Sequence, residues 1–265
     1  MARAIAPDEP KIVSVFIGRQ INMEDERMQI QVAACQSRYH FTAFLLRKYA
    51  CCDSMPACMR TLENLLFLCI LLLPAAAFPA EKGLTVTPED FSPFVGMGEN
   101  RYLGGVAEKY QVDFNLETDK ARAYQIYGQL TAGRLFPLPG VHEFTKRCKD
   151  RSLKLAVATS ADRVKMEINL ASLGLPDGAF DQTVNGLEVE RKKPSPDIYL
   201  EAARRIGCKP EECLVVEDAV SGILAGKAAG CRCLALTTSF PADRLGMADW
   251  ICHTLEDAPD EAITW

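Results

Sequence analysis

The chain contains 265 residues with a formal net charge of −5, and 48% of them are hydrophobic and 25% charged. This composition excludes a collagen-like, low-complexity or highly charged disordered chain, and the length favours one large domain or two modest ones. The mild acidity gives no reason to expect a nucleic acid or an anionic membrane as a partner. The 11 cysteines and three histidines show neither a zinc spacing nor a secreted disulfide pattern, so we expect reduced thiols and a cytoplasmic protein.

Residues 1–80 differ from the rest because they contain a single glycine, Gly18, of the 17 in the chain. Since the tight turns of α/β proteins need glycine, we expect an atypical N-terminal segment, disordered or foreign to the rest of the fold. Its best strand pattern is the apolar run Ile12–Ile17. A second apolar run, Leu65–Leu73, is too short to span a membrane, and a buried helix is favoured over an export signal or a wrongly translated segment.

Residues 81–136 have the pattern of a small helical unit. Glycine-bearing turns separate three helical stretches, Glu89–Phe94, Glu99–Tyr110 and Thr118–Tyr127. The breaker Pro137–Gly140 then leads the chain into the region that follows. We therefore expect a helical insertion that leaves a larger domain and returns to it.

From residue 137 to the C-terminus, short apolar runs alternate with helical patterns. Strands are expected at residues 153–158, 180–184, 213–216, 232–236 and 250–252, and helices at residues 141–151, 161–173, 195–207 (with Ser195 as N-cap) and 219–229. Helices of this length between strands predict a parallel sheet covered on both faces, as in α/β domains. In such sheets the functional site lies beyond the carboxyl ends of the strands.

Polar residues stand at the expected strand ends. Thr159 and Ser160 follow one strand, Glu217 and Asp218 end another, and Lys193 precedes the helix between them. These residue types suit phosphoryl transfer, in which Thr159 would donate its hydroxyl and backbone N–H to a phosphate and Lys193 would supply positive charge. The two carboxylates would hold Mg²⁺, a cation that prefers oxygen ligands. The plainer alternatives are helix caps for Thr159 and Asp218 and a solvated turn for Lys193.

Three segments at these positions closely resemble the second, third and fourth motifs of the haloacid dehalogenase (HAD) superfamily, in the same order: Leu155–Ser160 (LAVATS), Lys193–Tyr199 (KPSPDIY) and Leu214–Gly222 (LVVEDAVSG). The segment Gly83–Ala107 is similar to the helical cap of the β-phosphoglucomutase-like phosphatases of that superfamily. The resemblance covers residues 81–265. It implies an α/β fold with a Rossmann-like parallel sheet core, residues 137–265, and a small α-helical cap, residues 81–136.

The resemblance also implies residue roles and a substrate class. Thr159 and Lys193 look like catalytic residues, Ser160 like a phosphate-binding residue, and Glu217 and Asp218 like the magnesium ligands. The implied substrate is a small phosphorylated metabolite such as a sugar phosphate, and the implied cofactor is Mg²⁺. We expect a monomer with neither a nucleic acid nor a membrane as partner.

The first motif of the family, Asp-x-Asp, is absent from residues 1–80. It supplies the aspartate nucleophile and the general acid/base. Asp53 is the one aspartate near its expected place, and its surroundings favour a solvated loop residue. The run Ile12–Ile17 would fill the vacant central place in the sheet, but it ends at Gly18 without a carboxylate. Three interpretations stay open: a phosphatase or phosphomutase by ancestry that lacks its nucleophile, a non-catalytic phosphate- or partner-binding protein, and an enzyme whose first 80 residues are wrongly translated.

Overall fold

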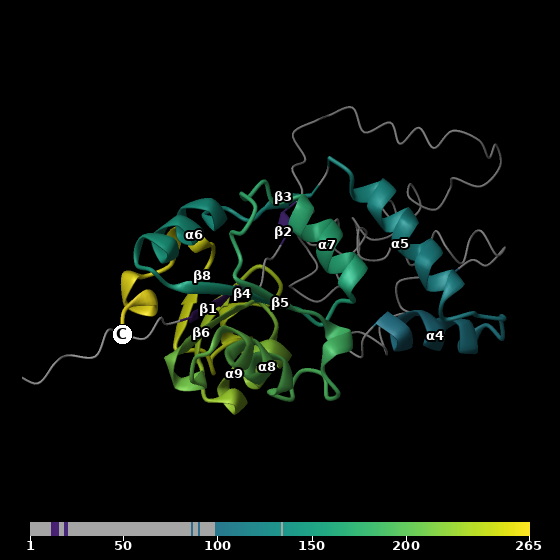
Figure 1. The fold of residues 1–265 in the computed structure, drawn as a ribbon. Coiled ribbons are helices and arrows are strands. Elements are labelled where there is room, and N and C mark those ends of the chain that lie inside the picture. Colours follow the sequence, from purple (N-terminus) through teal and green to yellow (C-terminus); the bar gives the residue numbers. More distant parts are fainter. Residues whose placement is uncertain (1–11, 16–18, 21–85, 87–89, 91–98, 134) are drawn as a thin grey trace, which may run out of the picture.

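The computed structural model describes residues 12–15, 19–20, 86, 90, 99–133 and 135–265. Within them the chain forms a six-stranded sheet with helices around it and a separate pair of two-residue strands (Figure 1). The predictions for Asp53, for Leu65–Leu73 and for most of the helix at Glu89–Phe94 lie outside the described residues. In the part of the chain that is described, no helix has the length and apolarity needed to cross a membrane.

Every strand pairing in the large sheet is parallel, and the strand order is β5-β4-β1-β6-β7-β8. The strands are β1 (Ile12–Val15), β4 (Lys154–Ala158), β5 (Gln182–Val184), β6 (Cys213–Glu217), β7 (Arg232–Leu236) and β8 (Trp250–Cys252). Strand β1 lies in the middle, with Val13 opposite Leu155 on one side and Leu214 on the other. The prediction that the Ile12–Ile17 run fills the central place of the sheet is confirmed for Ile12–Val15.

Helices cover both faces of the sheet, and strand β6 shows how its residues are divided between them. Val215 packs in an apolar cluster with α8 (Asp197–Ile206) and α9 (Val220–Ala229), whereas Leu214 and Val216 pack in a second cluster with α6 (Val141–Asp150). All three strand residues are fully buried. This alternation is what a strand with two buried faces requires, and the predicted α/β fold is confirmed.

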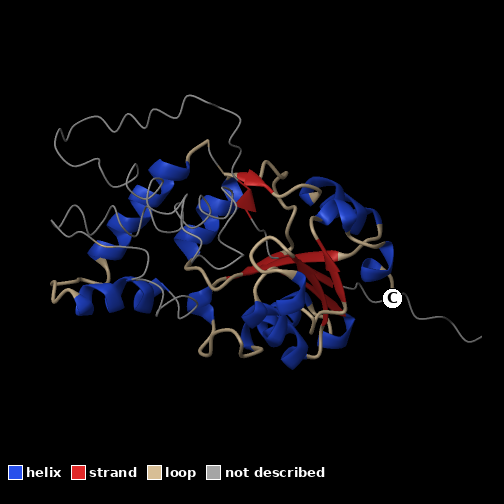
Figure 2. Cartoon of the chain, turned by 180° about the vertical axis from the view of Figure 1, so that it is seen from behind, coloured by secondary structure: helices blue, strands red, loops and turns tan. Residues whose placement is uncertain are grey.

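The second, two-stranded sheet joins distant parts of the chain. Strand β2 (Arg19–Gln20) pairs antiparallel with β3 (Phe136–Pro137), which lies where the sequence predicted only a breaker. The helices α4 (Glu99–Lys109) and α5 (Thr118–Thr131) lie between these strands in the chain and confirm two of the helices predicted there. Figure 2 shows both helices standing apart from the sheet, with α7 (Arg163–Ala171) between α5 and the strands.

The start of helix α8 corrects one prediction. Ser195 was expected to be the N-cap, but the helix begins at Asp197 and Pro196 takes the cap position without a side-chain bond. The Ser195 hydroxyl donates instead to the Asp197 carboxylate, at 2.8 Å. That carboxylate also accepts from the Arg191 guanidinium. The Ser195 hydroxyl therefore binds a side chain instead of a backbone N–H group at the start of α8.

Candidate functional site

The parallel sheet brings the predicted site residues to one edge. Thr159 and Ser160 follow β4, while Glu217 ends β6 and Asp218 follows it. Because β1 lies between β4 and β6, these two pairs flank its carboxyl end. Lys193 lies on the connection between β5 and α8 and reaches across to Glu217, with 2.6 Å between Nζ and Oε2.

Glu217 is the centre of a buried polar cluster. Its Oε2 accepts from Lys193 and from the Tyr199 hydroxyl, at 2.6 and 2.8 Å, and its Oε1 accepts from the backbone N–H groups of Asp218 and Ala219, both at 3.1 Å. The Glu217 side chain is 1% exposed and that of Lys193 8%. Burial alone would raise the pKa of Glu217, but the charge of Lys193 and these hydrogen bonds lower it below its ordinary value. Glu217 is therefore a carboxylate that anchors Lys193.

Helix α9 accommodates this carboxylate because residue 222 is glycine. A Cβ atom built on Gly222 would lie 2.1 Å from Cδ of Glu217, well inside van der Waals contact. The Glu217 carboxylate also accepts from Ala219, the N-cap residue of α9, so its negative charge lies at the positive end of the helix dipole. The Gly at the end of the LVVEDAVSG segment thus has a steric role in the site.

Asp218 lies beside this cluster in a different environment. Its Oδ2 accepts from the hydroxyls of Thr238 and Ser239, at 3.1 and 2.5 Å, on the segment that follows β7. Burial, and then the charge of Glu217, raise the pKa of Asp218 to about 7. The alternative that Asp218 caps the next helix is wrong, because Ala219 takes the N-cap position of α9.

Thr159 makes two local hydrogen bonds. Its backbone N–H donates to the carbonyl of Val184 in β5, at 3.0 Å, and its Oγ1 accepts from the N–H of Ala161, at 3.2 Å. The expectation that the Thr159 N–H binds phosphate is therefore wrong, since that donor completes the sheet. The hydroxyl keeps its own hydrogen for donation. Thr159 is not the cap of α7 either, because Asp162 holds that position.

The short 3₁₀ helix η3 (Gly186–Glu188) brings the Lys193 segment close to Ser160. A Cβ atom on Gly186 would lie 2.2 Å from the carbonyl oxygen of Ser160, and the N–H of Gly186 donates to the Ala161 carbonyl at 2.8 Å. On the other side of this turn, the Lys192 ammonium donates to the carbonyls of Gly186 and Val189. The segment with Ser160 and the segment with Lys193 thus both contact the same turn.

Three residues of the cluster were not predicted from the sequence: Tyr199, Thr238 and Ser239. Tyr199 extends from α8 so that its ring lies 4.8 Å from the Lys193 ammonium, and its buried hydroxyl binds Glu217. Tyr199 ends the KPSPDIY segment that resembles the third motif of the family, but its bond to Glu217 does not follow from the sequence. Thr238 and Ser239 follow the end of β7, so the strand-end rule that identified Thr159 would have identified them too.

The acidic pair fits a magnesium ion in part. Both carboxylates are buried, and the raised pKa of Asp218 arises from burial and from Glu217, two effects that a bound divalent cation would offset. Among the described residues there is no group of three histidine, cysteine or acidic side chains that could hold a metal. Mg²⁺ often takes one or two protein carboxylates and completes its shell with water and phosphate oxygens. The donor set agrees with that pattern.

The three residues that directly follow β1 in the sequence include no acidic residue. Val15, the last residue of β1, pairs with Val216, which directly precedes Glu217. The next three residues of the sequence are Phe16, Ile17 and Gly18, which lie outside the described residues and carry no acidic group. The run Ile12–Ile17, part of which forms the central strand, therefore ends at Gly18 without an acidic residue.

Comparison with known proteins identifies a family and several relatives. Residues 51–230 match the model of a family described as haloacid dehalogenase-like hydrolase. Over 164 residues the chain is 43% identical to Protein SUPPRESSOR OF QUENCHING 1, chloroplastic, from Arabidopsis thaliana, which covers 60% of this chain and 15% of that protein. Over 119 residues it is 36% identical to Hexitol phosphatase A from Escherichia coli K12, which covers 45% of this chain and 54% of that protein.

The fold is also similar to solved structures. The crystal structure of β-phosphoglucomutase from Clostridium difficile matches with a TM-score of 0.60 and 19% identity, over 74% of this chain and 88% of that one. At this identity the likeness shows the fold alone. The chain spans less than two thirds of the length of both curated relatives, and the family match begins at residue 51, after β1.

Proposed function

Because the chain belongs to the haloacid dehalogenase-like hydrolase family, we propose that its site binds the phosphate of a small phosphorylated metabolite such as a sugar phosphate. Hexitol phosphatase A and a solved structure of a putative β-phosphoglucomutase from Thermotoga maritima, which is 28% identical to this chain, support the β-phosphoglucomutase-like phosphatase branch of that family. The observation that carries the proposal is the buried ion pair of Lys193 and Glu217 at the strand edge between Ser160 and Asp218. The structural cost of burying these charges is hard to explain unless the ammonium serves a ligand.

The site residues would divide between them the binding of the phosphate group and of Mg²⁺. Lys193 binds Glu217 through its ammonium, and the positive charge of that ammonium would neutralise phosphate oxygens. Thr159 would donate its hydroxyl hydrogen, and Ser160 would add a second donor. Asp218, supported by Thr238 and Ser239, would hold Mg²⁺ with Glu217 beside it. When bound, this ion would offset negative charge on the phosphate and the carboxylates.

The hydrolytic step itself lacks a residue in the proposed site. Family members form an aspartyl-phosphate on the first aspartate of Asp-x-Asp, and the sequence after β1 has Phe16 and Ile17 instead. We therefore expect strongly impaired hydrolysis with phosphate binding retained, which also makes a non-catalytic phosphate-binding protein the second candidate. Asp53 stays the one proposed alternative nucleophile. A cytoplasmic location, a monomeric state and a division into cap and core stay predictions.

Two measurements on the purified full chain test the proposal. Inorganic phosphate binding with Mg²⁺ present, measured by titration calorimetry, should occur in the wild type and weaken in Lys193→Ala. Mg²⁺-dependent hydrolysis of p-nitrophenyl phosphate should be near background. Phosphate binding unchanged in Lys193→Ala would contradict the proposed site.

Fast hydrolysis lost in Asp53→Asn would identify Asp53 as the nucleophile and remove the impairment. Translating the other reading frames of the coding DNA tests the remaining interpretation. The first motif of the family, Asp-x-Asp-Gly, is expected about 20–25 codons ahead of Glu81. If another reading frame encodes it there, the first 80 residues are wrongly translated.

A further inference from the structure

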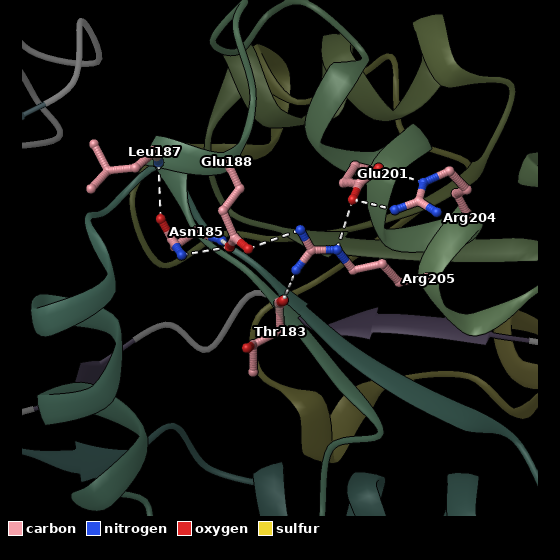
Figure 3. A network of polar contacts seen from close by, with 7 residues as sticks. All are labelled: Thr183, Asn185, Leu187, Glu188, Glu201, Arg204 and Arg205. Atoms are coloured by element: carbon pink, nitrogen blue, oxygen red, sulfur yellow. Dashed lines mark hydrogen bonds and ion pairs between the residues drawn. The ribbon is translucent and has the colours of Figure 1, made fainter.

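A network of charged and polar residues holds η3, the turn that precedes Lys193 in the chain, away from the phosphate-binding groups themselves. Its centre is Arg205 on α8, and its members come from β5, η3 and α8 (Figure 3). The Arg205 guanidinium donates to the carbonyl of Thr183 at 2.8 Å, pairs with Glu188 at 2.8 Å, and donates through Nε to Glu201 at 2.7 Å. One side chain thus joins a strand, a turn and a helix.

Glu188 links Arg205 to the conformation of η3. Its second oxygen accepts from the backbone N–H of Asn185 at 2.8 Å and from the Asn185 side chain at 2.5 Å. The Asn185 side-chain oxygen in turn accepts from the N–H of Leu187, at 2.9 Å. This is a reciprocal capping box, in which Glu188 and Asn185 fix the turn from both ends. Arg205 therefore fixes the residue that closes the turn.

The turn η3 also contacts two segments that carry residues of the proposed phosphate site. Gly186 lies so close to the Ser160 carbonyl that no Cβ atom fits between them. The carbonyls of Gly186 and Val189 accept from Lys192, the residue directly before Lys193. A displacement of η3 would consequently move Ser160 and Lys193 relative to each other.

We infer that Arg205 is a positioning residue that sets the geometry between Lys193 and the Thr159–Ser160 segment. The inference rests on the proposed phosphate site. The guanidinium is planar and has five N–H donors, so it can bind three partners in fixed directions, which a lysine ammonium on a flexible stem cannot do equally well. Arg205 and Glu188 are partly buried, at 23% and 33% side-chain exposure, and they belong to a network rather than to an isolated surface pair.

The neighbouring Arg204 provides a matched control. It binds the same Glu201 through two hydrogen bonds of 2.8 Å, but its side chain is 71% exposed, and within the described part of the chain it makes no bond to β5 or η3. Removing Arg204 therefore removes a guanidinium, an ion pair and a bond to Glu201 while leaving the turn in place. Any effect that belongs only to helix α8 should appear in both arginine variants.

The test measures inorganic phosphate affinity of the full chain by titration calorimetry, with Mg²⁺ present. We expect Arg205→Ala and Glu188→Gln each to weaken phosphate binding about tenfold, as loss of a supporting residue does in ligand sites, while Arg204→Ala stays within about twofold. The double variant should be no weaker than either single variant, because both substitutions break one link. Arg205→Lys should restore only part of the loss, and urea unfolding shows that each variant is folded.

Equal losses in Arg204→Ala and Arg205→Ala would overturn the inference, and so would additive losses in the double variant. Normal phosphate affinity in folded Glu188→Gln overturns it as well, even where Arg205→Ala fails to fold. The Lys193→Ala variant separates the inference from the proposed function. Weakened binding there with unchanged binding in Arg205→Ala refutes only the positioning role, whereas unchanged binding in Lys193→Ala refutes the phosphate site.

Discussion

The buried ion pair between Lys193 and Glu217 makes a strong prediction about stability. Lys193→Met keeps much of the aliphatic stem but leaves the Glu217 carboxylate without its cation, with the Tyr199 hydroxyl and two backbone N–H groups as its remaining donors. Breaking a buried pair by removing one partner costs about 3–5 kcal/mol, because the other charge stays buried and uncompensated. The Glu217 side chain is 1% exposed, so water can relieve little of that cost.

This loss is large enough to measure in two ways. For a chain of this size, 1 kcal/mol lowers Tm by about 2–4 °C, so we expect Lys193→Met to lower Tm by about 6–20 °C. Urea unfolding followed by circular dichroism gives the free energy of unfolding directly. The control is Lys146→Met, which breaks the pair with Asp150 on α6, where the side chains are 75% and 60% exposed. That variant should lose less than about 0.5 kcal/mol.

A second variant checks the cause of the loss. Lys193→Met combined with Glu217→Gln removes the orphaned charge and should regain a large part of the stability, since the buried carboxylate is the unfavourable group. A Lys193→Met loss no greater than that of Lys146→Met would refute the reasoning. So would a double variant as unstable as the sum of both single variants, because the two residues would then act independently.

Three further predictions concern other parts of the fold. Gly222→Ala places a Cβ atom 2.1 Å from Glu217 and should lower the free energy of unfolding by about 1–3 kcal/mol, measured by urea unfolding. Lys120→Ala removes the 2.6 Å pair that joins α5 to Asp162, so hydrogen exchange should become faster in residues 118–131 and stay unchanged in β6. Hydrogen bonds from Arg204 and Arg205 lower the pKa of Glu201 from 4.5 to about 2. The ionised Glu201 therefore stabilises the folded chain above pH 4.5, and this stabilisation is lost as the pH falls to about 2. Over this pH range the urea midpoint should fall less steeply in Glu201→Gln than in the wild type.

The sequence predicted several residues at strand ends, although it missed Thr238 and Ser239 after β7, and it missed residues whose roles depend on distant contacts. Thr159, Glu217 and Asp218 could be found because parallel strands end at a common edge. The partner of Glu217 on α8, Tyr199, could not be found, because a tyrosine in a helix binds whatever polar group the packing brings to it. The bond from the Thr159 N–H to Val184 was also missed, since it depends on how far the β4–β5 pairing continues.

The central strand could be predicted from the sequence because its place in the sheet depends on packing. The apolar run Ile12–Ile17 was expected to fill the centre of the sheet, and Ile12–Val15 does so although the family match starts only at residue 51. Three of the four residues of β1, Ile12, Val13 and Val15, are apolar and β-branched, which favours a place between two buried parallel strands. The acid that family members have after this strand is a chemical requirement rather than a packing requirement, so the sheet forms without it.

The pairing of β2 with β3 has a consequence for how this fold tolerates change. Residues 21–135 begin and end at one antiparallel ladder, where Arg19 stands opposite Pro137. The pairing of β2 with β3 brings the two ends of that stretch together. Doubling the number of residues between two such points costs only about 0.6 kcal/mol in closure entropy. Segments of very different length and origin can therefore be inserted there during evolution, while the strands on either side keep their register.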